Sequence, residues 1–125
     1  MYTPYDIEEG FRQSYMDKNL FILGLEKLVN NGFKIMMDDL KNGVDNQDFW
    51  KLGITIRSVK EIADYHGAKE LLRHSSKLKA HSDKSEINHI YPIYTRVARE
   101  LFLVRRALIK YLRENKGIEI MKIMV

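Results

Sequence analysis

The stretch from Asp48 to Ala68 constrains what this chain can fold into more than any other part of the sequence. Its apolar side chains recur at steps of three and four residues, which is the spacing of an amphipathic helix. Asp48 can cap the first turn, because its carboxylate can accept a hydrogen bond from an otherwise unpaired backbone N–H. Gly67 can end the helix in the left-handed conformation. We therefore predict a helix over 48–66 with a buried stripe made of Phe49, Leu52, Thr55, Ile56, Val59, Ile62, Ala63 and His66.

The opposite face of this predicted helix is charged. At about 100° per residue, Arg57 lies roughly 200° around the helix from Val59, so it should point away from the core. Its neighbours on that face are Lys60, Glu61 and Asp64. Opposite charges four residues apart predict the ion pairs Arg57–Glu61 and Lys60–Asp64. This face is the part of the sequence that most resembles a functional surface.

The rest of the chain also follows helical spacing, and sustained period-2 alternation, the pattern of a strand, is missing. Helices joined by short loops prefer antiparallel neighbours. We therefore expect an all-α fold, an antiparallel up-down four-helix bundle with a short additional N-terminal helix. The expected bundle helices cover about 18–42, 48–66, 69–79 and 84–115. A single domain over 1–116 would then be followed by an apolar tail over 117–125.

Several residues predict where these helices bend, start or stop. Asn30, Asn31 and Gly32 weaken the first long helix and favour a bend near 30–32, because glycine and asparagine are poor helix formers. The sequence of 42–45 is typical of a turn. Asp83 and Glu86 have the spacing of a capping box. Pro92 must either kink the last helix or mark its true start.

The central stretch resembles the signature of histidine phosphotransfer (HPt) domains. These are four-helix modules that pass a phosphoryl group between receiver domains in two-component phosphorelays. The family pattern has an Asp-aromatic pair, then His-x-Leu-Lys-Gly-Ser/Ala, then Gly-Ala ten residues after the histidine. In the same register this chain has Asp48-Phe49, Arg57-Ser58-Val59-Lys60-Glu61-Ile62-Ala63 and Gly67-Ala68. The resemblance implies the same four-helix architecture.

Two departures from the family pattern concern the chemistry. Arg57 stands where the family has its phosphorylated histidine, and Glu61 stands where the family has a small glycine. A guanidinium stays protonated and is not a nucleophile at ordinary pH. Glu61 adds bulk and negative charge where an incoming phosphoryl group would need room. The resemblance therefore implies a pseudo-HPt, with Arg57 at the phospho-acceptor-equivalent position and no catalytic residue.

The functional hypothesis that follows is a non-catalytic signalling protein of a two-component phosphorelay. By the resemblance, its partner is a response-regulator receiver domain or a sensor kinase, and receiver domains hold an acidic pocket at their phosphorylation site. A permanent cation at position 57 could enter that pocket without covalent chemistry. The expected partner-binding residues are Arg57, Lys60, Glu61 and Asp64.

Two alternatives remain open. In the first, the chain is an active phosphotransfer protein that uses another of its four histidines, His66, His74, His81 or His89. In the second, it is a structural or oligomerising bundle, with 117–125 as the interface between copies. Trp50 fits either the core or a partner-facing rim, where tryptophan is often an anchor.

Composition excludes several other classes. The chain has 125 residues, a net charge of +4 and no cysteine, so disulfides and thiolate metal sites are ruled out. It has no apolar run of the ~20 residues that a membrane helix needs and no signal-peptide pattern. We expect a cytoplasmic protein without cofactor, metal, membrane or nucleic-acid partner. The basic residues of the last helix are interpreted as a solvated face: Arg96, Arg99, Arg105, Arg106, Lys110, Arg113 and Lys116.

Overall fold

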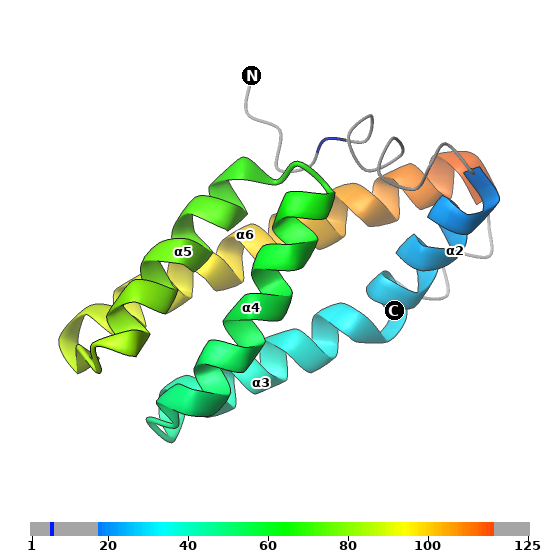
Figure 1. Ribbon diagram of the computed structural model, residues 1–125. Coiled ribbons are helices and arrows are strands. Elements are labelled where there is room, and N and C mark those ends of the chain that lie inside the picture. Colours follow the sequence, from blue (N-terminus) through cyan, green and yellow to red (C-terminus); the bar gives the residue numbers. More distant parts are fainter. Residues whose placement is uncertain (1–5, 7–17, 117–125) are drawn as a thin grey trace.

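The computed structural model describes Asp6 and residues 18–116, and the described part of the chain is helical without any strand (Figure 1). The all-α prediction is confirmed. The expected N-terminal helix and the apolar tail over 117–125 lie outside the described residues. In chain order the elements are α2 (Lys18–Lys27), the π-helical turn η1 (Leu28–Gly32), α3 (Phe33–Asp45), α4 (Phe49–Tyr65), α5 (Lys69–Asp83) and α6 (Ile87–Lys116).

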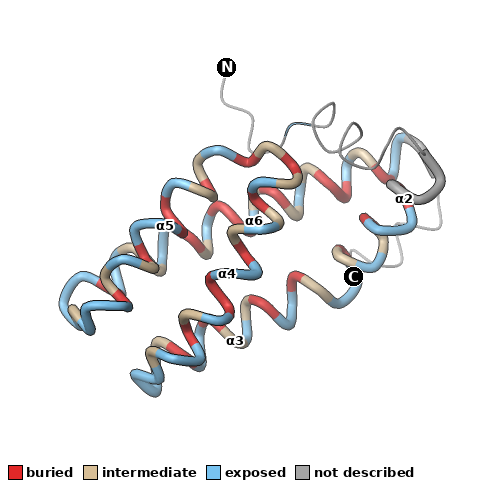
Figure 2. The backbone as a smooth tube through the Cα atoms, in the orientation of Figure 1, coloured by how far each residue is buried: buried red, intermediate tan, exposed pale blue. Residues whose placement is uncertain are grey.

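The helices form a bundle around one apolar core. α4 packs against α3 and α5, α6 packs against α5 and α3, and α2 packs against α6. Figure 2 shows buried positions recurring along each of these helices between exposed ones. Burying a large aliphatic or aromatic side chain contributes about 1.5–3 kcal/mol. The fully buried large side chains are Phe33, Leu25, Leu40, Leu52, Ile56, Leu71, Leu78, Leu101, Leu108, Leu112, Val29 and Val59.

α4 begins and ends through the residues that its sequence predicts. The backbone N–H of Lys51 donates to Asp48 Oδ1 over 3.1 Å, so Asp48 is the N-cap. At the other end Gly67 has a φ of 65°, in the left-handed region. That turn lets the Ala68 N–H donate to the carbonyl of Ala63 over 2.8 Å. Both capping predictions are confirmed, and the predicted range 48–66 agrees with the observed helix within one residue at each end.

The predicted bend near 30–32 coincides with η1, so the expected continuous α-helix over 18–42 is interrupted. A π-helical turn has hydrogen bonds from residue i to i+5 and therefore holds one more residue than an α-helical turn. A Cβ at Gly32 would lie 2.8 Å from Leu28 Cδ1, the far end of a flexible side chain, so a larger residue here would require that side chain to move. In Figure 1 the chain changes direction between α2 and α3 at this turn.

The turn predicted at 42–45 is wrong. α3 continues to Asp45, and the chain reverses at 46–48, where Gln47 has a φ of 53°. Gly43 is buried in the helix, and a Cβ there would lie 3.1 Å from Leu52 Cβ. Gly43 therefore allows α3 and α4 to approach closely, and its place in the sequence reflects packing instead of a turn.

The predicted end of the next helix at 79 is also wrong, because α5 continues through 80–83. Ser82 is buried at 2% exposure, and its hydroxyl donates to the Phe49 carbonyl of α4 over 3.4 Å. This contact with α4 lies between the predicted end of one helix at 79 and the predicted start of the next at 84. Asp83 ends α5 and does not cap α6, so the predicted capping box does not form.

α6 begins later than predicted, at Ile87 instead of 84, after a turn in which Ser85 has a φ of 53°. Pro92 lies inside this helix, so it does not mark the helix start. Pro92 is the sixth residue of α6, beyond the first turn, so its missing N–H removes one backbone hydrogen bond, to the carbonyl of Asn88. Among the residues of the described ranges, no helix is both long and apolar enough to cross a membrane.

Candidate functional site

The charged face of α4 points outward, as its helical spacing predicts. Arg57, Glu61 and Asp64 are exposed and Lys60 is half-buried. Val59, on the opposite side of the helix, is fully buried at 0% exposure. Arg57 is therefore on the surface, where another protein can reach it.

These side chains line a pocket of about 330 Å³ between α4 and α5, here called the α4 pocket. α5 supplies the second wall through Leu72 and Lys79. The sequence did not identify these two residues as part of the site. Their spacing of seven residues places them on one side of α5, but only the packing of α5 against α4 shows which side faces Arg57. The lining residues of the α4 pocket are Arg57, Lys60, Glu61, Asp64, Leu72 and Lys79.

The ion pairs predicted within α4 do not form. Ion pairs between lysine or arginine and a carboxylate are found on α3 and α5, as Lys41–Asp45, Arg73–Glu70 and Lys79–Asp83. Exposed pairs of this kind contribute little to stability, because solvent screens them and long side chains lose entropy. Arg57 thus has no ion pair with any described residue and can accept one from a partner.

Lys79 is held at one end of the α4 pocket. Its ammonium group pairs with Asp83, one turn further along α5. Its side chain lies across α4 at Gly53, where a Cβ would be 3.7 Å from Lys79 Cε. Gly53 is one turn before Arg57 on the same side of α4. Asp83 therefore neutralises the charge of Lys79, whereas the guanidinium of Arg57 pairs with no carboxylate in the described part of the chain.

His66 and His74 are buried and do not present an imidazole at this surface. His66 is 5% exposed at the C-cap of α4, and burial lowers its pKa to about 4. Its carbonyl accepts a hydrogen bond from the Asp6 N–H over 2.8 Å. His74 is 8% exposed on α5, and burial, followed by the nearby charge of Arg73, lowers its pKa.

The other two histidines lie at the turn between α5 and α6. His81 Nδ1 is 3.0 Å from Glu86 Oε1, and the His81 ring stacks on His89 with 5.0 Å between ring centres. Stacked rings direct their nitrogens along parallel planes instead of toward one ion. In the described part of the chain, no three histidine or carboxylate side chains gather in a way that could hold a metal ion.

Trp50 is 79% exposed, so the core interpretation of this residue is wrong and the rim interpretation remains. Ile54, one turn further along α4, is 47% exposed. Both residues precede Arg57 on the helix whose charged face lines the α4 pocket.

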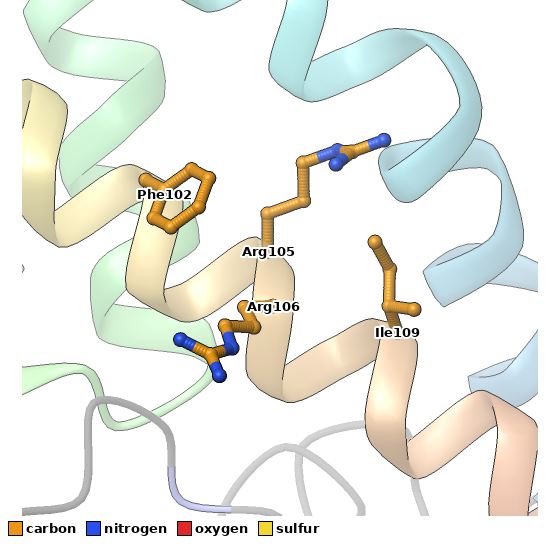
Figure 3. Close-up of a pocket in the computed structure, with 4 residues that line it drawn as sticks. All are labelled: Phe102, Arg105, Arg106 and Ile109. Carbon is orange, nitrogen blue, oxygen red and sulfur yellow. The ribbon is translucent and has the colours of Figure 1, made fainter. Parts of the chain in front are cut away.

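A second pocket, of about 280 Å³, lies on α6 and is lined by Phe102, Arg105, Arg106 and Ile109 (Figure 3). In Figure 3 the side chains of Arg105 and Arg106 leave α6 on opposite sides. The two guanidinium groups therefore do not converge on one anion. The geometry gives this pocket no defined ligand.

Comparison of the chain with protein-family models, with curated proteins and with solved structures gives no match.

Proposed function

We propose that the chain is a non-catalytic, HPt-like signalling protein that docks a receiver domain or a kinase-like partner through the α4 pocket. The observation that carries this proposal is the exposed Arg57, which lines one pocket together with Lys60, Glu61 and Asp64. Arg57 occupies the position that HPt domains give to their phosphorylated histidine. The order of the surrounding residues, from Asp48 to Ala68, supports the same register.

The finer architecture belongs to the same proposal: an antiparallel up-down four-helix bundle with a short N-terminal helix. Turns of three residues each, 46–48, 66–68 and 84–86, separate α3, α4, α5 and α6. Turns this short favour antiparallel neighbours. The packing of α4 on α3 and α5, and of α6 on α5 and α3, supports this arrangement.

The proposed mechanism is electrostatic docking. An arginine is always charged and presents a planar fork of donors that matches carboxylate geometry. In a receiver partner, Arg57 would enter the acidic phosphorylation site and compete there with a phosphorylated histidine. Charge pairs at an interface set orientation and association rate more than affinity. Binding should therefore weaken as salt rises, since the Debye length falls from about 10 Å at 0.1 M to about 3 Å at 1 M.

The test compares receiver binding by the wild type and by Arg57→Ala. Purified receiver domains from the organism that encodes the chain are titrated by calorimetry at low and high salt. We expect Arg57→Ala to weaken binding at least five-fold at low salt and to reduce its salt dependence. The matched control is Arg99→Ala, which removes an exposed arginine from α6 and should bind like the wild type. Equal binding by Arg57→Ala and the wild type would remove Arg57 from the role.

A rebuilt acceptor tests the same register by chemistry. Arg57→His with Glu61→Gly restores an imidazole and clears space around it. Incubated with a receiver phosphorylated on its aspartate, the double variant should take the phosphoryl group onto the new imidazole as an acid-labile label. The parent should remain unlabelled. Acid-labile label on the parent would instead mean that one of its own histidines accepts the phosphoryl group, which contradicts a non-catalytic role.

A further inference from the structure

Two large apolar side chains of α4 are exposed on the same face as Arg57. Trp50 and Ile54 are 79% and 47% exposed, although α4 packs against helices on its other sides. At about 100° per residue, Trp50, Ile54, Arg57 and Glu61 fall within roughly 60° of one another. They form one line along the outward face of α4, here called the α4 ridge, apolar at its N-terminal end and charged at its C-terminal end.

Trp50 leaves a large apolar surface in water, and no contact with a described residue explains why a tryptophan stands at this position. A tryptophan has one of the largest apolar side-chain areas, and burying it at an interface is strongly favourable. Its neighbour Leu52 is 0% exposed, so the helix has an inward face on which bulky side chains are buried. Trp50 is on the other face. Buried tryptophans surrounded by water-excluding contacts are the commonest anchors of protein interfaces.

Resting on the proposed function, we propose that Trp50 and Ile54 are the apolar anchor of the docking surface. The partner is a folded protein that presents an apolar depression beside a cluster of carboxylates. Trp50 and Arg57 are seven positions apart on the helix, which places the depression and the carboxylates about 10 Å apart. Arg57 has no ion pair with a described residue. The carboxylate cluster of the partner would therefore neutralise the guanidinium charge at that end of the α4 ridge.

The charges of the α4 ridge favour a protein over a lipid surface. An anionic membrane attracts faces on which lysine and arginine dominate. Here Glu61 and Asp64 stand beside Arg57 on the outward side of α4. A surface of mixed charge with an apolar end instead fits a partner whose own charges are arranged to match it.

The test uses the emission of Trp50, which is the only tryptophan in the sequence. The full chain is titrated with a receiver domain for which calorimetry has shown binding. This receiver domain either has no tryptophan or has its tryptophans replaced by phenylalanine. At saturation we expect the emission to shift to shorter wavelength and quenching by acrylamide to fall at least two-fold. Both changes would show that Trp50 passes from water into an apolar site.

Affinities of variants give the second measurement. Trp50→Ala should weaken receiver binding at least ten-fold and Ile54→Ala about three-fold. Phe102→Ala is the matched control, because Phe102 is 59% exposed on α6 and lies away from the α4 ridge; its affinity should stay within two-fold of wild type. Thermal unfolding of each variant confirms that the fold is kept.

Each other outcome overturns the inference in a distinguishable way. Calorimetric binding with unchanged Trp50 emission, or wild-type affinity of Trp50→Ala, would refute the apolar anchor and leave the role of Arg57 intact. A wild-type chain that binds no receiver would refute the proposed function and the anchor together. An emission shift caused by raising the concentration of the chain alone, with a doubled mass in sedimentation, would show that the α4 ridge joins two copies.

Discussion

Replacing His66 should remove part of the acid sensitivity of the fold. Burial at the C-cap of α4 lowers the pKa of His66 from 6.5 to about 4. The unfolded chain therefore binds a proton at this residue in a pH range in which the folded chain does not. The contribution of neutral His66 to the free energy of unfolding is present in full above pH ~6.5. It is lost as the pH falls from there to ~4.

The size of this effect follows from the pKa shift. One pKa unit corresponds to about 1.4 kcal/mol, so the shift of His66 contributes a loss of about 3 kcal/mol once the pH is below 4. At pH 5 the folded protein still has a neutral His66, while the unfolded chain is mostly protonated there. The expected loss from this residue between pH 7 and pH 5 is therefore about 2 kcal/mol.

Urea unfolding at pH 7 and pH 5 measures this contribution. The wild type should lose about 2 kcal/mol more than His66→Gln over this interval, because the amide of glutamine does not titrate. His89→Gln, which removes an exposed imidazole, is the matched control and should keep the wild-type difference. If His66→Gln and the wild type lose the same free energy of unfolding, burial of His66 does not set the acid limit of the fold.

Four substitutions test the packing and capping of α4 by chemical denaturation. Asp48→Ala removes the N-cap and should cost about 1 kcal/mol. Gly67→Ala forces a Cβ into a φ of 65° and should cost about 1 kcal/mol. Leu52→Ala leaves a cavity at a fully buried position and should cost about 2–5 kcal/mol. Trp50→Ala should change stability by no more than about 0.5 kcal/mol, and a loss above 2 kcal/mol would show that Trp50 is packed.

The features that the sequence predicts well are local to α4. The Asp48 cap, the Gly67 stop and the outward direction of Arg57 all follow from residues within a few positions of one another. Helical spacing fixes which side of α4 is buried without reference to any other helix. The candidate surface residues could therefore be named before the fold was known.

The features that the sequence misses depend on contacts between helices. The segment around Gly43 has the composition of a turn, but the close approach of Gly43 to Leu52 keeps it inside α3. The sequence predicts a helix end at 79, but α5 continues to Ser82, whose hydroxyl donates to the Phe49 carbonyl. Lys79 belongs to the α4 pocket only because α5 packs beside Gly53. None of these contacts leaves a signal in the spacing of residues along one helix.

The π-helical turn η1 has a consequence for changes in chain length. Deleting one residue from an α-helix rotates everything beyond the deletion by about 100°, which would turn buried positions toward water. A π-helical turn already carries one residue more than an α-helical turn, so it can lose a residue by returning to α-helical hydrogen bonding. Leu28–Gly32 is thus the segment of α2, η1 and α3 where a natural one-residue deletion would be tolerated best. Relatives of this chain that are one residue shorter before α4 should have their gap at this turn.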